Sequence, residues 1–278
     1  MIKKIDCHMH SNCSDGELSP AKLMQKCSEQ EIDCVVLTDH DTVDGVKEAM
    51  IVCQKLNIGF FVGVELSSVY NGRGFHILGL GVDYQNEVLL DSLNHSRNLR
   101  LERAEKIISE LERYGWKVNS SIFNKADGVA TRMEIVEAVK NKEMSADEFF
   151  DKWLGKNCLC FVEMERITVK KAIEIIHEAG GIAVLAHPVK TMEKDLKFLP
   201  QIVKEFKVLG LDGLETFYPE YNGIQTKIVY DLTIEYELIP TAGSDFHRLN
   251  SLRELGKHNF YGLKFDPEKI IDSLSNRG

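Results

Sequence analysis

The chain has 278 residues, 44% of them hydrophobic and 28% charged, so it is long enough to bury a full core and too apolar to remain disordered. Its formal net charge of −9 argues against a general basic surface for long nucleic acid, because such binding depends on neutralising many phosphates. A short or monomeric phosphorylated ligand is not excluded, because a local positive centre can outweigh an overall acidic field.

The N-terminal residues contain no apolar stretch of signal-peptide length, and no later segment approaches the roughly 18 to 20 apolar residues that a membrane helix requires. The seven cysteines form no C-x-x-C pair, and their odd number fits a reducing compartment better than a disulfide framework. We therefore expect a soluble, cytoplasmic protein without a structural zinc finger.

Short apolar, β-branched runs alternate with helical patterns along most of the chain, which is typical of a parallel α/β sheet or barrel. Ser19-Pro20 predicts a helix that extends to about Gln30, with serine as the N-cap and proline in the first turn. A second helix is predicted over 42–56. The predicted strands are 2–7, 34–38, 60–64, 75–80, 182–186, 211–217 and 238–242.

Residues 91–159 interrupt this alternation, because the segment is rich in Glu, Lys, Arg and Leu at helical spacing and contains no convincing strand. One helix is predicted to stop at Tyr114-Gly115, and its apolar and basic stripe consists of Leu99, Arg103, Ile107 and Leu111. We therefore predict that residues 1–90 and 160–278 form one α/β unit, and that residues 91–159 form an inserted helical lobe.

The first predicted strand ends in Asp6-Cys7-His8-Met9-His10. Because alternate side chains of a strand share one face, Asp6, His8 and His10 can converge on one point, and two imidazoles at this spacing form half of a metal site. Asp15 lies in a turn that could return a carboxylate over the strand end. An ordinary turn aspartate is the alternative interpretation of Asp15.

The second predicted strand ends in Thr38-Asp39-His40-Asp41. Three ionisable groups at the end of a buried strand would be desolvated unless they are paired or bound to metal. Active sites of α/β barrels also lie at this end of the strands. We interpret His40 as a metal ligand, and Asp39 and Asp41 as partners of ligands or as helix-start carboxylates.

Further candidates stand at or near the ends of later predicted strands: Glu65, His76, His187, Asp245 and His247. A single histidine at a strand end is often only a hydrogen-bonded structural residue. Six of the nine histidines, however, occupy such positions, and this distribution favours a metal site. Neutral imidazole with carboxylate and no cysteine suits zinc, manganese or iron(II), and the choice among them stays open.

These motifs resemble, in order and over nearly the whole chain, those of the PHP superfamily, named for polymerase and histidinol phosphatase. The matching segments are Asp6-x-His8-x-His10, Ser14-Asp15-Gly16, Thr38-Asp39-His40-Asp41, Gly63-Val64-Glu65, His76, Ala186-His187-Pro188 and Gly243-Ser244-Asp245-Phe246-His247. The blocks 180–188 and 212–215 are typical of a stand-alone branch with nucleotide and short-RNA phosphoesterases.

The resemblance implies a distorted (β/α)7 barrel whose strand ends hold two or three divalent metal ions (Mn, Fe or Zn). Phosphoester hydrolysis would then proceed by attack of a metal-bound hydroxide. The implied ligand sets are His8, His10, Glu65 and Asp245 for the first ion, Asp15, His40 and His247 for the second, and Glu65, His76 and His187 for the third.

Two arginines, Arg132 and Arg248, are candidate contacts to the substrate, and a surface or lobe salt bridge is the ordinary alternative for each. The branch often has a histidine where this chain has Glu134, which weakens inference about the substrate. The function implied first is hydrolysis of phosphomonoesters of small nucleotides, such as 3′,5′-bisphosphates, or of the 5′ ends of short RNA. The alternatives are a histidinol-phosphate phosphatase and a catalytically silent metal-binding PHP module, and the intact ligand set argues against the silent module.

Overall fold

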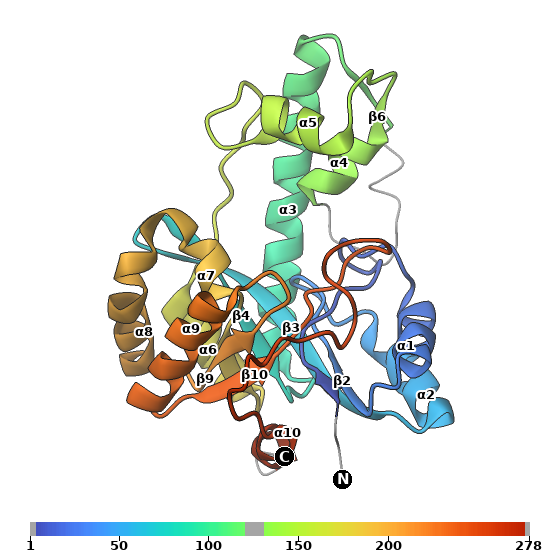
Figure 1. Ribbon diagram of the computed structural model, residues 1–278. Helices are drawn as coiled ribbons and strands as arrows, with labels where there is room; N and C mark the ends of the chain where they lie inside the picture. Colours follow the sequence, from blue (N-terminus) through green and yellow to red (C-terminus); the bar gives the residue numbers. More distant parts are fainter. Residues whose placement is uncertain (1–3, 120–130, 276–278) are drawn as a thin grey trace.

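The computed structural model describes residues 4–119 and 131–275, and a mixed sheet lies at its centre (Figure 1). Within these ranges the sheet has eight strands. Seven lie in the spatial order β1 (Ile5–Asp6), β2 (Cys34–Leu37), β3 (Gly59–Tyr70), β4 (Arg73–Leu80), β8 (Ile182–Leu185), β9 (Gly213–Phe217) and β10 (Ile239–Ala242). The eighth, β7 (Ile167–Thr168), pairs with the end of β3. Neighbouring strands run parallel, except that β4 is antiparallel to β3 and β8.

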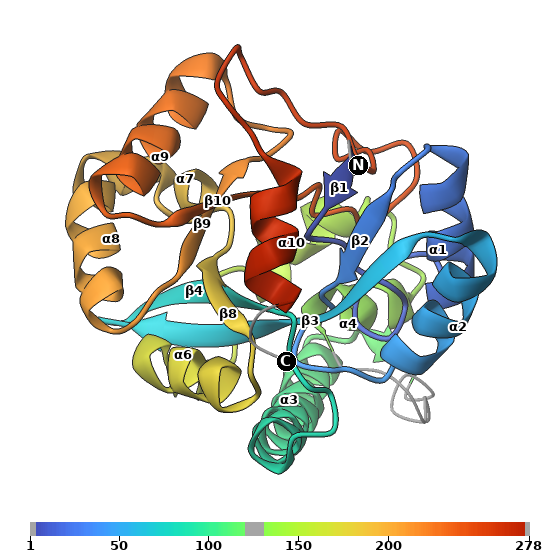
Figure 2. The ribbon, with the colours of Figure 1, turned by 90° about the horizontal axis from the view of Figure 1, so that it is seen from below.

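Helices cover the outside of the sheet, and α10 lies across its lower end (Figure 2). The helices around the sheet are α1 (Pro20–Glu29), α2 (Val46–Leu56), α6 (Val169–Glu178), the short α7 (Pro188–Thr191), the 3₁₀ helix η3 (Glu193–Phe198), α8 (Leu199–Val208), α9 (Gly223–Glu235) and α10 (Pro267–Ser275). Apolar side chains at helical spacing, such as Ile173 and Ile176 of α6, bury one face of each outer helix against the strands. Ile270 and Leu274 of α10 pack at the end of the sheet where the parallel strands begin. The opposite end is therefore the one available for a site.

Two helix ends follow the local signals in the sequence. The Ser19 side chain accepts a hydrogen bond from the Lys22 N–H, and Pro20 begins α1, as predicted. The long helix α3 (Glu87–Arg113) stops before Gly115, whose φ of +86° suits glycine. Among the described residues, none of the helices has both the length and the hydrophobicity needed to cross a bilayer.

The strands β3 and β4 form a hairpin, so the expectation of parallel strands separated by helices is wrong at this point. Asn71 and Gly72 connect them with φ values of +49° and +75°, as a two-residue type I′ turn requires. Because β4 runs against its neighbours, its beginning lies at the end of the sheet where the parallel strands finish. His76, near the start of β4, is thereby placed opposite Ser67.

Backbone hydrogen bonds also connect the segments that follow β1 and β10, the two ends of the strand order. The Cys7 N–H donates to the Ala242 carbonyl at 2.9 Å, and the Asp245 N–H donates to the His8 carbonyl at 2.8 Å. The His10 N–H donates to the Phe246 carbonyl at 2.9 Å. The residues after the first strand and after the last strand therefore lie side by side.

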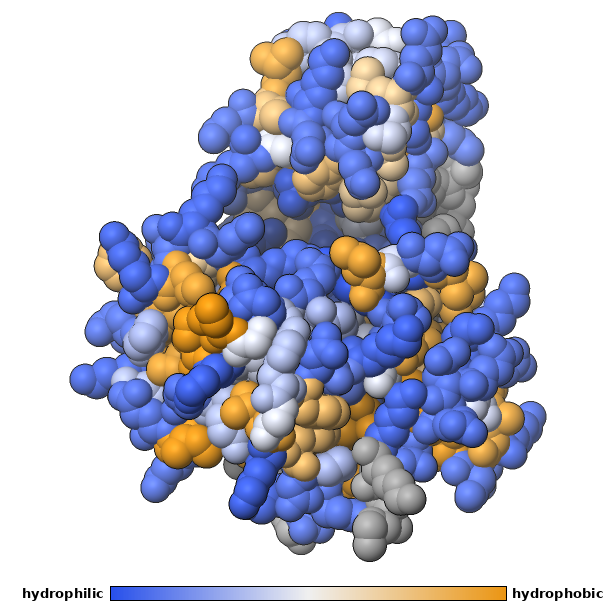
Figure 3. Space-filling model, viewed as in Figure 1, coloured by the Kyte–Doolittle hydropathy of each residue, from blue (hydrophilic) through white to orange (hydrophobic). Residues whose placement is uncertain are grey.

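The helix α3 begins on the sheet and ends in a second hydrophobic cluster, formed within the lobe (Figure 1). The lobe contains α4 (Arg132–Ala138), α5 (Ala146–Phe149), a π-helix η2 (Phe150–Leu154) and the antiparallel pair β5 (Lys117–Val118) and β6 (Val139–Lys140). The expectation of a lobe without strands is therefore wrong for this short pair. Figure 3 shows the molecular surface hollowed between the lobe and the sheet.

Candidate metal centre

The nine side chains predicted to bind metal come together at the end of the sheet where the parallel strands finish. Their positions follow from the strands: His8, His10 and Asp15 come after β1, His40 after β2, Glu65 within β3, His76 within β4, His187 after β8, and Asp245 and His247 after β10. The backbone turns sharply at three of these strand ends, where Asp41, His187 and Asp245 have φ values of +50°, +31° and +52°. Strained non-glycine residues of this kind are common at functional sites.

Glu65 is the centre of the cluster and is completely buried. Five histidine rings surround it: Oε2 lies 3.1 Å from Nε2 of His8, Nε2 of His10 and Nδ1 of His40, and Oε1 lies 2.9 Å from Nδ1 of His76 and 3.2 Å from Nε2 of His187. One carboxylate thus contacts side chains from four separate segments of the chain, and both of its oxygens face imidazole nitrogens.

The potential ligand atoms fall into three overlapping groups, in each of which the atoms lie within 4.8 Å of one another. The groups are His8, His10, Glu65 and Asp245; His10, Asp15, His40 and His247; and His40, Glu65 and His76. The first group has the composition expected from the resemblance, and the second adds His10 to the expected set. The third has His40 where His187 was expected, although His187 also lies beside Glu65.

Several buried polar atoms of the cluster make no hydrogen bond with any described residue: Nδ1 of His10, His40 and His76, and Oδ1 of Asp15. Two of them, in His40 and His76, are close to Glu65 oxygens but are not oriented for hydrogen bonding. Buried polar groups without partners are costly. Divalent cations would compensate this cost, because lone pairs of nitrogen and oxygen would then point at a shared positive charge. The donor set therefore fits metal ions.

The electrostatics of the cluster also favour cations. Burial alone would raise the pKa of Glu65, Asp15 and Asp245, but the surrounding histidines lower all three below their ordinary values. Burial lowers the pKa of His40 to about 3, so this ring is neutral and has a free lone pair. For His10, hydrogen bonds to Asp245 and Glu65 outweigh the effect of burial and raise the pKa to about 10. The carboxylates therefore draw positive charge into the pocket.

Glu215 is a buried carboxylate behind the histidines whose role the sequence did not assign. Its Oε1 lies 2.8 Å from Nδ1 of His8, and its Oε2 accepts a hydrogen bond from the backbone N–H of His187 at 2.6 Å. A carboxylate on the far ring nitrogen fixes the tautomer and orientation of a metal-binding histidine. The sequence did contain one signal for this role, since Glu215 lies within an apolar predicted strand. A glutamate is rarely buried without a partner, so its position there indicated a buried contact.

Gly243 has no side chain, and the side chains of Glu215 and His8 fill the space where one would lie. A Cβ at this position would lie 2.3 Å from Oε1 of Glu215 and 2.4 Å from Cβ of His8. We expect Gly243→Ala to weaken metal binding about 10- to 100-fold, the usual cost of disturbing such partners, as measured by Mn²⁺ titration of metal-free protein. Gly72→Ala, where a Cβ meets open space and only the positive φ is strained, should lose about 1 kcal/mol of stability and keep its metal affinity. Equal metal affinities in the two variants would contradict the expectation.

Two other carboxylates near the cluster stabilise the backbone. Asp6 accepts hydrogen bonds from the N–H groups of Ser244 at 2.9 Å and Gly256 at 2.8 Å, so it does not converge with the histidines as the strand alternation suggested. Asp39 accepts from the N–H of Ser11 at 2.7 Å and from its hydroxyl at 2.6 Å. Both aspartates fix loops that carry cluster residues.

The two arginines predicted to contact the substrate have protein partners. Arg132 donates to the Leu154 carbonyl at 2.9 Å, and its guanidinium lies 4.7 Å from the centre of the Phe150 ring. Arg248 forms an ion pair with Glu137 of the lobe at 2.8 Å, and its side chain is 44% exposed. The surface salt bridge considered as the alternative is therefore present for Arg248, whereas Arg132 is held by a carbonyl and an aromatic ring.

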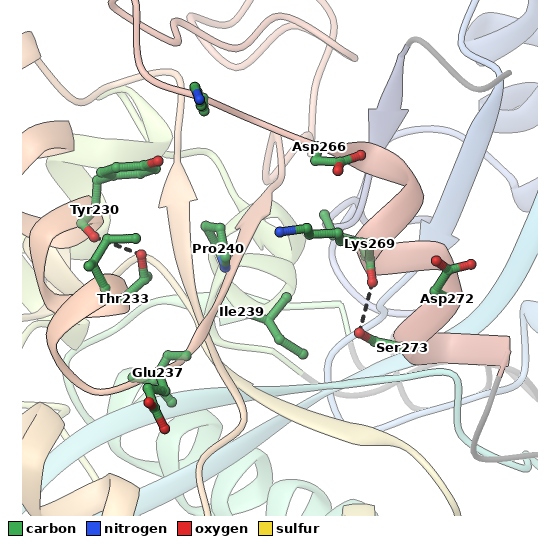
Figure 4. Close-up of a pocket in the computed structure, with 13 residues that line it drawn as sticks. Tyr230, Thr233, Glu237, Ile239, Pro240, Asp266, Lys269, Asp272 and Ser273 are labelled. Atoms are coloured by element: carbon green, nitrogen blue, oxygen red, sulfur yellow. Dashed lines mark hydrogen bonds between the residues drawn. The ribbon is translucent and has the colours of Figure 1, made fainter.

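Two cavities of similar size differ in their relation to the cluster. One, of about 590 Å³, lies among α9, the start of β10 and α10, and Figure 4 shows Tyr230, Pro240 and Lys269 in its lining. None of the residues that line it is a histidine or a cysteine. The other, of about 550 Å³, is lined by Asp15, Arg248 and lobe residues, so it opens beside the cluster. We therefore place the reaction at the histidine end of the sheet.

Comparisons with known proteins agree with this geometry. Residues 6–115 match the family model described as PHP domain. A 5′-3′ exoribonuclease of Haemophilus influenzae is 35% identical over 93% of this chain and 95% of its own length. A 3′,5′-nucleoside bisphosphate phosphatase of Chromobacterium violaceum is 28% identical over 88% of each chain. A solved amidohydrolase from Chromobacterium violaceum, with bound sulfate and no metal, has a TM-score of 0.85 and 25% identity over 99% of this chain and 97% of that one.

The sequence motifs, the family model and the similar proteins thus all indicate the same family. The similar proteins align with nearly the full length of the chain. The clustered imidazoles and carboxylates supply the metal site that such enzymes require. The chain belongs to the PHP family and is a metal-dependent phosphoesterase, a hydrolase that acts on phosphate ester bonds.

Proposed function

We propose that this enzyme hydrolyses phosphomonoesters of small nucleotides, with 3′,5′-bisphosphates as the first substrate class and the 5′ ends of short RNA as the second. One observation carries the proposal: four arginines gather beside the metal cluster, where a second phosphate of such a substrate would bind. They are Arg100 and Arg103 on α3, Arg132 at the start of α4, and Arg166 just before β7.

The four arginines interact unfavourably with one another. Burial, and then the positive charges of Arg132, Arg166 and Arg100 in that order of importance, together lower the pKa of Arg103 to about 10. Burial and the neighbouring arginines also lower the pKa of Arg132 and of Arg166. Of the four, only Arg100 has an ion pair with a carboxylate among the described residues, and Nε of Arg166 is buried without a hydrogen-bond partner there. Such a group of cations is stabilised when an anion binds to it.

Arg100 connects this group to the metal cluster. It forms an ion pair with Asp41, the residue after His40, and donates to the Ser67 hydroxyl at 2.9 Å. Ser67 lies opposite His76 in the β3–β4 pair. Burial alone would raise the pKa of Asp41, but Arg100 and the Ser67 N–H lower it overall, so the pair is charged. The arginines therefore begin next to the predicted ligands, on the helix α3 that runs from the sheet into the lobe.

Two anion sites side by side favour a substrate with two phosphates. A bisphosphate could place one phosphate at the metal cluster and the other at the arginines, whereas histidinol phosphate would leave the arginines without an anion. The curated relatives support the same class, because one is named a nucleoside bisphosphate phosphatase and another an exoribonuclease.

We further propose that the nine clustered side chains hold two or three divalent ions, with manganese, iron or zinc as candidates. When bound, these ions supply Lewis-acid polarisation of the phosphoryl group and an activated water as nucleophile. In this assignment Glu65 and Asp245 balance the charge of the ions, Glu215 orients His8, and the arginines orient the substrate.

We also infer that the seven-strand path closes into a distorted (β/α)7 barrel, with residues 1–90 and 160–278 as the barrel and 91–159 as the inserted lobe. The hydrogen bonds between the ends of β1 and β10 and the separate hydrophobic cluster of the lobe support this division. An experimental structure in which these two strand ends lie apart would contradict the closure.

The test is a set of phosphorylated substrates assayed with Mn²⁺ after chelation and dialysis. We expect turnover of adenosine 3′,5′-bisphosphate. Arg166→Ala should raise the KM for this bisphosphate about 10- to 100-fold, because a charged hydrogen bond contributes about 1.5 to 3 kcal/mol, and should change the KM for adenosine monophosphates little. The matched control is Arg113→Ala, an arginine at the end of α3 that is 73% exposed and that pairs with Glu110 in the described part of the chain.

Each alternative predicts a different result. Turnover of histidinol phosphate without turnover of the bisphosphate would contradict the proposed substrate class. Full metal content without turnover of any substrate would favour the catalytically silent module. An unchanged bisphosphate KM in Arg166→Ala would remove the arginines from substrate binding.

A further inference from the structure

We propose that Arg253, together with Tyr218, is a positioning residue of the metal centre that determines which oxygen of Asp245 faces the ions. This inference rests on the proposed assignment of Asp245 as a metal ligand. It adds a residue from the long loop that follows His247, a segment in which the sequence suggested only Arg248 as functional.

The two oxygens of Asp245 have different surroundings. Oδ1 lies 3.3 Å from Nε2 of His10, 3.3 Å from Nδ1 of His247 and 3.5 Å from Nε2 of His8. Oδ2 accepts two hydrogen bonds, from the Tyr218 hydroxyl at 2.8 Å and from Nη1 of Arg253 at 2.8 Å. One oxygen therefore faces the histidine cluster while the other is occupied by two protein donors. A carboxylate held in this way offers a single oxygen to a cation.

Arg253 is itself held on several sides. Its Nε donates to Glu220 at 2.5 Å, and its guanidinium carbon lies 5.9 Å from the centre of the Tyr218 ring. The side chain is only 21% exposed, and that of Asp245 is 5% exposed. The positive charge of Arg253 is thus shared between Asp245 and Glu220, and the guanidinium has one preferred orientation.

The loop that carries Arg253 has no helix or strand in the described residues between His247 and α10, yet it is fixed at two points. The Leu249 N–H donates to the Glu17 carboxylate at 2.9 Å, and the Gly256 N–H donates to Asp6 at 2.8 Å. Gly256 has a φ of +64°, and a Cβ there would lie 2.5 Å from Cε of Lys4. Arg253 lies between these two fixed points, so the loop holds the Arg253 side chain next to Asp245.

Arg248, in the same loop, has a different environment. Its ion pair is with Glu137 on the lobe and is half-exposed on both sides, whereas the Arg253 pair is largely buried. Exposed pairs contribute little, and buried charged hydrogen bonds are costly to break on one side. The loop arginine with the larger effect on the metal centre is therefore Arg253.

The experiment compares metal binding and kinetics in Arg253→Ala, Arg253→Lys and Tyr218→Phe. Metal-free proteins are titrated with Mn²⁺ by equilibrium dialysis with metal analysis, without substrate. We expect Arg253→Ala to bind at least one ion about 10- to 100-fold more weakly and Arg253→Lys to recover part of the loss, because lysine restores the charge with a single donor. Tyr218→Phe should change affinity in the same direction. Lys257→Ala, in the same loop but 61% exposed, is the control and should bind like the parent.

The kinetic pattern separates positioning from substrate contact. At saturating Mn²⁺ we expect a lower kcat with little change in the KM of the bisphosphate, the opposite of the pattern expected for Arg166→Ala. Added guanidinium ion should partly restore kcat in Arg253→Ala.

Parent-like Mn²⁺ affinity, stoichiometry and kcat in Arg253→Ala would overturn the inference about Arg253 and would leave the proposed function unaffected. If that variant does not fold, parent-like binding by the nearly isosteric Tyr218→Phe would overturn it instead. A parent protein that binds no divalent ion would overturn the ligand assignment as well, whereas an incorrect substrate class would leave the metal titrations unaffected.

Discussion

Replacing Glu65 with glutamine should lower kcat by about 10³-fold or more and should reduce the metal content of the purified protein. Glu65 contacts five histidines from four strands, so the change removes one negative charge from the middle of the whole cluster. A factor of 10³ corresponds to about 4 kcal/mol, which is within the several kcal/mol that metal ions contribute to transition-state stabilisation. The amide would also direct N–H donors toward ring nitrogens that are expected to face cations.

The measurements are kcat on the best phosphoester and the metal content by mass spectrometry. The control is Glu205→Gln on α8, where the carboxylate accepts hydrogen bonds from Tyr70 and Gln201 among the described residues and should be replaceable. A Glu65→Gln variant with the full number of ions and a parent-like rate would show that the cluster is organised around other residues.

Removing the ions from the parent protein should lower its melting temperature by about 10 °C, and adding Mn²⁺ should restore it. Ligands that bind only the folded state stabilise by RT ln(1 + [L]/Kd), about 4 kcal/mol at 1,000 times Kd. For a chain of this size each kcal/mol corresponds to roughly 2 to 4 °C. Calorimetry with and without a chelator measures the shift. A melting temperature independent of chelator and of Mn²⁺ would contradict metal binding at this site.

The stabilisation of the folded protein by Mn²⁺ should depend on pH. In the absence of metal the pKa of His10 is raised to about 10 from its ordinary 6.5, so its proton stabilises the folded metal-free protein fully below 6.5 and progressively less as the pH rises toward 10. Stabilisation by Mn²⁺ should therefore increase over this window, with release of a proton on binding. His40, whose pKa burial lowers to about 3, is already neutral and should release none. Calorimetry at pH 6 and pH 9 distinguishes this outcome from a metal effect that is constant with pH.

Local signals predicted most of the secondary structure because they act within a few residues. The cap at Ser19 and the stop at Gly115 both depend on neighbouring backbone groups, and both are present. The β3–β4 hairpin also had a local signal, Asn71-Gly72, but the expectation of regular βα alternation outweighed it. The short β5–β6 pair had no such signal, because two-residue strands are too brief to show any periodicity.

The side chains of the site were predictable because strand ends of one sheet meet at one edge. Asp6 was the exception: alternation suggested that it would join His8 and His10, but β1 ends at Asp6 and the chain beyond it no longer follows strand geometry. Glu215 was given no role, because its partner His8 is 207 residues away in the sequence, and Arg253 was given none either. Arg253 in particular lies in an irregular loop, where no periodic pattern indicates which way a side chain faces.

The continuous helix α3 has a consequence for the size of the substrates in the proposed binding mode. Its first turns are packed on the sheet through Leu89 and Leu93, and its last turns are packed in the lobe through Ile107 and Leu111. Arg100 and Arg103 lie between these anchors, about one helical turn or roughly 5 Å apart along the axis. Because both ends of the helix are packed in place, the distance between the arginines and the clustered histidines is fixed. If the proposed binding mode holds, a compound whose anionic groups are separated by a much shorter or longer span would engage only one of the two proposed sites.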